Sequence, residues 1–287
     1  MDSPQARLRV EDDGLHCPDV GSWAEKKYRL VALYAELFAT GMKKKWGKRV
    51  YIDLYAGAGF SRTQGTSTIL KSSPILALTV NQPFDKYIFC ERDEKNMSAL
   101  KVRTARIAPA ADVDFVSGDC HAQVNTICSL IPKHSPGNTV LSLCFGDPFD
   151  FGIKFDTIRK LSKFYIDFLV LLAIGMDANR NYDHYVEGEH KKIDEALGGT
   201  EWRGRWKEAG IRREDFRPFL AREFAASMES LNYLPLPIHQ MVQVRSSEKN
   251  LRLYYLALFS RKPVAYEFWK DVLKYSTDQT HFNFPEE

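Results

Sequence analysis

The sequence alternates short apolar runs with segments of helical periodicity through its first 175 residues. Runs rich in β-branched and aromatic residues predict strands at 50–55, 86–90, 113–116, 139–145 and 168–174. Helical patterns lie between them, at 74–80, 94–107, 121–130 and 155–164. Strands that alternate with helices of this length form βαβ units. We therefore expect an α/β fold with a Rossmann-like, doubly wound, mostly parallel sheet.

Three other regions depart from this alternation. An amphipathic helix is expected from Trp23 to Phe38, with Ser22 as its N-cap and Gly41 as its stop. Between 176 and 233 strand patterns disappear, which indicates a helical insertion. Runs at 238–244 and 251–259 predict a terminal antiparallel hairpin, and a helix at 265–275 follows it. The predicted division is an N-terminal helical extension (1–48), a cofactor-binding core (49–175), the insertion (176–235) and a hairpin and helix that complete the core (236–287).

The first predicted strand ends at Asp53 and runs through Tyr55 into a turn that contains Gly57 and Gly59. Glycines at this point let the backbone approach a nucleoside at the carboxyl end of the strand. A plain strand-to-helix turn is the alternative. A dinucleotide site needs a third glycine at position 62, but Arg62 stands there and a Ser/Thr-rich stretch follows. The missing pyrophosphate site favours S-adenosylmethionine as the ligand.

Acidic residues follow the next two strands. Glu91 ends the second strand, where its carboxylate can accept hydrogen bonds from both hydroxyls of a ribose, and a surface glutamate is the alternative. Asp119 and Cys120 follow the third strand. An acidic side chain there can accept a hydrogen bond from an adenine amino group, with a backbone N–H on a ring nitrogen. Capping of the following helix by Asp119 is an equal alternative.

The fourth strand ends in Asp147, Pro148 and Phe149. This segment resembles the D-P-P-Y element of amino-directed methyltransferases, in which a polar acceptor holds an amine and an aromatic ring stacks on its base. Phe149 stands where that element has its second proline, so amino-group methylation is suggested only, and a turn that closes the strand is the alternative. Methyl transfer needs mainly the orientation of a nucleophile against a sulfonium methyl group.

Taken together, these segments resemble the three-Cys-motif partner protein family, TcmP. The matching stretches run in order along the chain, at 20–23, 25–27, 51–59, 73–74, 147–149, 177–181, 199–202 and 254–263. The resemblance implies a class I S-adenosylmethionine-dependent methyltransferase-like fold and a partner protein that bears three cysteines. It also implies that Lys27 and Arg180 face the cleft, although a solvated helix lysine is an alternative for Lys27. Family members often have glycine where this chain has Asp150.

Charge points to a nucleic acid only locally, because 40 basic residues nearly balance 37 acidic ones. Cations cluster at 42–49 around Trp46, either as a solvated connection or as a phosphate-contacting patch. The insertion interleaves arginines and lysines with Trp202 and Trp206, which would stack on bases or pack inward. The loop at 60–73, with Arg62, would border the substrate and close over it.

The five cysteines, Cys17, Cys90, Cys120, Cys128 and Cys144, have no metal-ligand spacing with histidine, and their odd number argues against a disulfide framework. We therefore expect no metal site. No signal-peptide pattern and no apolar run of membrane-spanning length occur, so a cytoplasmic protein without membrane contact is expected.

These features predict an S-adenosylmethionine-dependent methyltransferase that acts on a nucleic acid. The alternative is a non-catalytic protein that binds a nucleic acid or a partner and retains the methyltransferase fold. Carboxylates at three strand ends argue against that alternative, since a scaffold needs none of them. A nicotinamide-dependent oxidoreductase is disfavoured by the absent third glycine and by the Asp-Pro-Phe strand end.

Overall fold

The computed structural model describes residues 8–174, 182–187, 191–210, 212, 215–245 and 252–274. Its main sheet has seven strands in the order β10-β11-β9-β8-β3-β6-β7. Five of them are parallel: β3 (Lys48–Asp53), β6 (Lys86–Glu91), β7 (Val113–Ser117), β8 (Val140–Gly146) and β9 (Ile166–Leu172). In chain order these five run 3-2-1-4-5, which is the order of a doubly wound Rossmann sheet. The predicted fold class is confirmed.

A hairpin of β10 (Val242–Arg245) and β11 (Arg252–Phe259) completes the sheet. The later strand, β11, pairs antiparallel with β9, and β10 lies outside it at the edge. The hairpin was predicted, but its first strand starts later than expected. Residues Ile238–Gln240 instead form a short 3-10 helix, η2. Pro237 is its N-cap residue, and the Pro237 carbonyl accepts a hydrogen bond from the Gln240 N–H.

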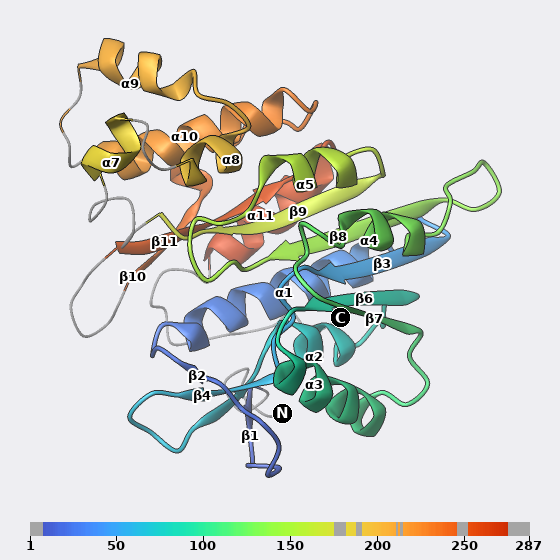
Figure 1. Cartoon of the computed structure of the whole chain (residues 1–287). Coiled ribbons are helices and arrows are strands. Elements are labelled where there is room, and N and C mark those ends of the chain that lie inside the picture. Colours follow the sequence, from blue (N-terminus) through green and yellow to red (C-terminus); the bar gives the residue numbers. More distant parts are fainter. Residues whose placement is uncertain are drawn as a thin grey trace.

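Helices cover both faces of the sheet (Figure 1). One core contains α1 (Ala24–Met42), α2 (Ser73–Leu78), α3 (Glu94–Ile107) and α11 (Pro263–Lys274). The other contains α4 (Val124–Leu130), α5 (Phe155–Leu161) and the helices of the insertion. Alternate side chains of one strand enter opposite cores: Val50 and Ile52 of β3 face the second core, whereas Tyr51 faces the first.

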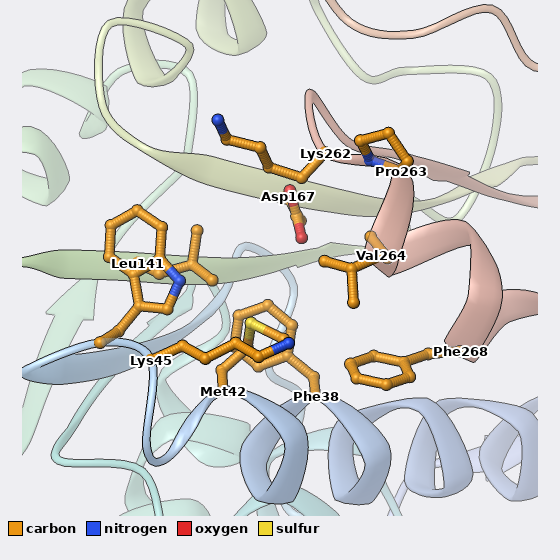
Figure 2. A pocket seen from close by; sticks show the side chains of 11 residues that line it. Phe38, Met42, Lys45, Leu141, Asp167, Lys262, Pro263, Val264 and Phe268 are labelled. Carbon is orange, nitrogen blue, oxygen red and sulfur yellow. The ribbon is translucent and has the colours of Figure 1, made fainter.

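Helix α1 begins at Ala24 after Trp23, and no side-chain hydrogen bond from its N-cap residue, Trp23, caps it. The helix continues through Gly41 to Met42, so the prediction that Gly41 stops it is wrong. A Cβ at Gly41 would lie 2.3 Å from the Phe268 ring of α11. Gly41 therefore allows the close contact between α11 and α1 that is visible in Figure 2. No helix within the described ranges is long and apolar enough to cross a bilayer.

The insertion between β9 and β10 contains α7 (Tyr182–Glu187), α8 (Lys192–Leu197), α9 (Trp202–Ala209) and α10 (Phe216–Glu229), which lie together in Figure 1. Trp202 and Trp206 are 0% and 5% exposed and pack against Phe216. Of the two alternatives for these tryptophans, inward packing is therefore confirmed, and stacking on bases is wrong. Their spacing on α9 places both indoles on the apolar face of the helix.

The segment 60–73, predicted as a closing loop, is a hairpin instead. Strands β4 (Phe60–Thr63) and β5 (Ile69–Lys71) pair antiparallel, and β1 (Arg9–Val10) and β2 (Asp19–Val20) flank them in a second sheet of order β1-β5-β4-β2. Its Ser and Thr residues indicated a loop. The buried side chains of Phe60, Ile69 and Leu70 hold it against the core.

Candidate functional site

The sheet reverses its strand order between β3 and β8, because β6 and β7 extend it on one side and β9 on the other. Open α/β sheets bind ligands at this switch point, outside the carboxyl ends of the strands. Asp53 and Glu91 end β3 and β6, Asp119 lies two residues after the end of β7, and Asp147 directly follows β8. The four strands are neighbours in the sheet, so the predicted carboxylates lie together at the carboxyl ends of the strands.

The glycine turn after β3 is held by backbone hydrogen bonds from Leu54 to Phe145 and from Ala56 to Cys90. Gly57 and Gly59 have φ angles of +66° and +86°, a conformation that side chains other than glycine rarely adopt. A Cβ on Gly57 would meet nothing within 4 Å, whereas one on Gly59 would lie 3.0 Å from Ile75 and 3.2 Å from Leu100. Gly59 thus allows α2 and α3 to pack closely, and Gly57 presents open backbone to a ligand.

The carboxylate of Asp53 is fully buried beneath this turn. It accepts hydrogen bonds from the Tyr55 N–H at 3.2 Å and from the Tyr51 hydroxyl at 3.4 Å. Burial raises the pKa of Asp53 to about 7, although bonds from Ser73 and Tyr55 act in the opposite direction. Asp53 therefore stabilises the turn through its hydrogen bond with the Tyr55 N–H, and its contact with a cofactor stays a prediction.

Glu91 fixes the same turn from the neighbouring strand. One oxygen accepts from the Gly57 N–H and the other from the Asp93 N–H, both at 2.7 Å. Each carboxylate oxygen has a further lone pair, so ribose hydroxyls can still bind. The alternative of a plain surface glutamate is wrong, because Glu91 is only 9% exposed.

Asp119 accepts from the backbone N–H groups of His121 and Ala122 through one oxygen, at 2.9 and 3.1 Å. These bonds close a turn ahead of α4, whose N-cap residue is Gln123, so the capping alternative is wrong. The second oxygen of Asp119 forms no hydrogen bond with a described residue. Cys120 is buried beside it, and burial raises the pKa of its thiol to about 11. A reactive thiolate is not indicated.

His121 belongs to this region, although the sequence analysis did not single it out. Its Nε2 lies 3.3 Å from the Tyr55 hydroxyl and 3.0 Å from the Gly152 carbonyl, and its Nδ1 lies 2.8 Å from the Thr157 hydroxyl. Burial lowers the pKa of the imidazole, so the ring is neutral at neutral pH. A lone histidine after a strand carries no sequence signal that would reveal these contacts.

At the tip of β8, Asp147 forms an ion pair of 2.5 Å with Lys27 of α1. The two side chains are only 17% and 9% exposed. Burial acts to lower the pKa of the Lys27 amine, but the charge of Asp147 and its hydrogen bond outweigh that effect and raise it. The alternative of a solvated helix lysine is therefore wrong.

Two tyrosines line the same tip. The Tyr28 hydroxyl lies 3.2 Å from that of Ser61 in β4. The hydroxyl of Tyr254 in β11 is buried and has no hydrogen-bond partner among the described residues. Burial raises the pKa of Tyr254, and the nearby charge of Asp147 raises it further. An unpaired buried hydroxyl beside a charged pair is a group that a bound ligand can satisfy.

The rest of the Asp147 segment turns outward. Pro148 is buried, Phe149 is 100% exposed, and Asp150 forms a 2.7 Å ion pair with Lys192. Arg62 of β4, a predicted substrate residue, forms an ion pair of 2.8 Å with Asp12, which lies between β1 and β2. Arg180 lies outside the described residues. Among the residues that are described, no group of three His, Cys, Asp or Glu side chains is placed to hold a metal ion.

No family model matches the sequence, and no curated protein matches it either. Solved structures do match it at low identity. The O-methyltransferase TomG from Streptomyces achromogenes, solved in complex with SAM, is 13% identical, with 89% of this chain and 93% of that chain covered and a TM-score of 0.43. A protein from Legionella pneumophila is 10% identical, with 86% and 90% covered and a TM-score of 0.47. Similarity at this level does not bear on what this chain binds.

Proposed function

We propose that the chain is an S-adenosylmethionine-dependent methyltransferase. The observation that carries this proposal is the switch point itself, where a glycine turn with open backbone at Gly57 is surrounded by four acidic strand ends. The turn leads into β4, which starts at Phe60, and not into a helix. A dinucleotide pyrophosphate binds at a helix N-terminus, so this turn suits a nucleoside without one.

The cofactor would lie across the strand ends. Its ribose hydroxyls would donate to the free lone pairs of Glu91, and its adenine amino group to the unoccupied oxygen of Asp119. Its sulfonium end would pass Gly57 toward the tip of β8. The positive sulfonium would be attracted to the carboxylates of Glu91 and Asp119, which form no ion pair with a described residue.

The acceptor would be held at the tip of β8. S-Adenosylmethionine would supply its methyl group to the acceptor's lone pair and leave as a neutral thioether. The proton that the acceptor loses would pass to solvent water. Asp147 would accept a hydrogen bond from the acceptor group through the lone pairs that its contact with Lys27 leaves free. Phe149 is fully exposed and would stack on a planar acceptor.

A nucleic acid with an amino-group acceptor remains the substrate that we propose, on the Asp-Pro-Phe segment and the exposed ring of Phe149. The resemblance to three-Cys-motif partner proteins adds a second proposed partner, a protein that bears three cysteines. Neither proposal uses the tryptophans of the insertion, which are buried.

One observation favours a binding protein without turnover. Lys27 already donates to Asp147, so an ammonium group of the chain itself occupies the position in which an acceptor amine would be held. An enzyme would have to share or displace this contact in each turnover. Transfer of a labelled methyl group therefore separates the two functions.

The decisive variant is Asp147→Asn, assayed with a labelled methyl group on RNA and DNA acceptors. We expect turnover to fall about 100-fold while S-adenosylmethionine affinity is retained, because orientation of the acceptor is lost. Asp150→Asn, three residues away and paired with Lys192, is the matched control and should keep activity. Undiminished methylation by Asp147→Asn would remove Asp147 from the site.

A further inference from the structure

Three aromatic rings, exposed at His134 and Tyr165 and half-buried at Trp46, meet in tilted and edge-on contacts at the amino ends of the strands, opposite the candidate site. Trp46 precedes β3, His134 precedes β8 and Tyr165 precedes β9. The Trp46 ring centroid lies 5.9 Å from that of His134 and 5.7 Å from that of Tyr165, and His134 and Tyr165 are 4.4 Å apart. We call these three residues the ring stack.

The ring stack is fixed in place and open to solvent. The Val140 N–H donates to Nδ1 of His134 at 3.0 Å, which fixes the position of the imidazole ring. Tyr165 is 48% exposed, and His134 is exposed as well. Aromatic rings held in this way give a preformed surface for planar groups.

Uncompensated positive charge surrounds the ring stack. The exposed lysines within two residues of its members are Lys44, Lys45, Lys48, Lys133 and Lys163. None of them forms an ion pair with the part of the chain that the structure describes, and the one acidic residue within two residues of the ring stack in sequence, Asp167, is buried. Arg49 differs, because its guanidinium is buried and pairs with Asp85. The free lysines would bind phosphates.

A cavity of about 240 Å³ adjoins the ring stack and shares Trp46 as a wall. Its other walls include Phe38 and Phe268, and Lys45 and Lys262 line it as well (Figure 2). Pockets for drug-sized ligands are larger, roughly 300–1,000 Å³, so this cavity suits one ring system. Asp167 offers an acceptor for an N–H group on that ring.

We propose that this edge binds single-stranded nucleic acid, with bases on the ring stack, one base in the cavity and phosphates on the lysines. Rings that alternate with free cations are what sequence-tolerant single-strand binding requires. An acidic protein segment would use the lysines but leave the rings unused, and a duplex keeps its bases paired. The inference shares with the proposed function a nucleic acid as partner, but it requires no methyl transfer.

The test is fluorescence anisotropy of a labelled 12-nucleotide single-stranded RNA, with the DNA of the same sequence and its duplex alongside. Tyr165→Ala and Trp46→Ala should each weaken binding about 10-fold, because stacking on one base is lost. Lys44→Glu should also make affinity less dependent on salt: the negative slope of log affinity against log salt concentration should become shallower by about 0.7. Lys207→Glu, an exposed lysine of α9, is the control and should bind like the wild type.

Val264→Trp fills the cavity from α11, leaves all three residues of the ring stack in the chain, and should also weaken binding. Unaltered binding by this variant would remove the cavity from the site. Equal affinity for the duplex, or wild-type affinity in Tyr165→Ala, which changes a half-exposed residue and should not unfold the protein, would overturn the proposal.

Failure here and failure of the methyltransferase proposal can be told apart. Calorimetric titration of Tyr165→Ala with S-adenosylmethionine should give wild-type affinity, because the two sites lie at opposite edges. If S-adenosylmethionine binds and the RNA does not, this inference fails alone. If the RNA binds through the ring stack and S-adenosylmethionine does not bind, the proposed function fails alone.

Discussion

Single residues at the candidate site have structural roles that their residue types do not indicate. Glu91 was predicted to bind a ribose, and it also fixes the turn at Gly57 through a backbone hydrogen bond. Lys27 has the sequence context of a solvated helix lysine, yet it is buried against Asp147. Nothing in the local sequence distinguishes these environments, because Lys27 and Asp147 are 120 residues apart. The carboxylates could be predicted from their strand ends, but their partners could not.

Buried carboxyl groups predict a pH dependence of stability. Burial raises the pKa of Asp167 to about 7 from 3.8, despite a hydrogen bond from Ser260 and the charge of Arg261. The native state therefore holds a proton that the unfolded state has lost between about pH 4 and pH 7. Stability contributed by Asp167 is present below this range and is lost as pH rises through it.

The measurement is urea unfolding of wild type and Asp167→Asn from pH 4 to pH 8. Since one pKa unit corresponds to about 1.4 kcal/mol, the variant should gain on the wild type by up to that amount per pH unit across the range. The difference should become constant above about pH 7. A difference in unfolding free energy that is the same at every pH would contradict the assigned pKa.

At the scale of elements, the sequence predicts those with a strong periodic pattern and misses those that depend on distant partners. Helix α3 begins and ends at the predicted residues, Glu94 and Ile107. The hairpin β4–β5 was missed because its pairing with β1 and β2 is set by the N-terminal arm. Arg103 holds this N-terminal segment, which contains β1 and β2, against the core. Its guanidinium binds Asp13 and the carbonyl of Ala58 in the glycine turn.

The two glycines of the turn give an element-scale prediction. Gly57→Ala should lose S-adenosylmethionine affinity with a stability cost of about 1–2 kcal/mol, because a positive φ is strained but no atom is near its Cβ. Gly59→Ala carries the same strain and also presses on Ile75 and Leu100, so it should lower the melting temperature further. Thermal unfolding and calorimetry on both variants check this. If Gly57→Ala lost as much stability as Gly59→Ala, its Cβ would have to press on neighbouring atoms, and the space beside Gly57 would not be open to a ligand.

For the molecule as a whole, alternation of strands and helices was enough to predict the doubly wound sheet, and two adjacent β-rich runs predicted the terminal hairpin. Alternation also predicted that the acidic residues of the candidate site would lie together, because the carboxyl ends of neighbouring parallel strands share one end of the sheet. The ring stack at the other edge was visible in sequence only as a basic segment around Trp46. His134 and Tyr165 come from separate connections, so only the folded sheet brings the three rings together.

The central claim is that the switch point binds S-adenosylmethionine. It is tested most directly by calorimetric titration of the purified protein with S-adenosylmethionine, S-adenosylhomocysteine and NAD in parallel. We predict one binding site for each of the first two and no binding of NAD, because the turn offers no helix N-terminus to a pyrophosphate. Binding of NAD alone, or of none of the three, would contradict the account.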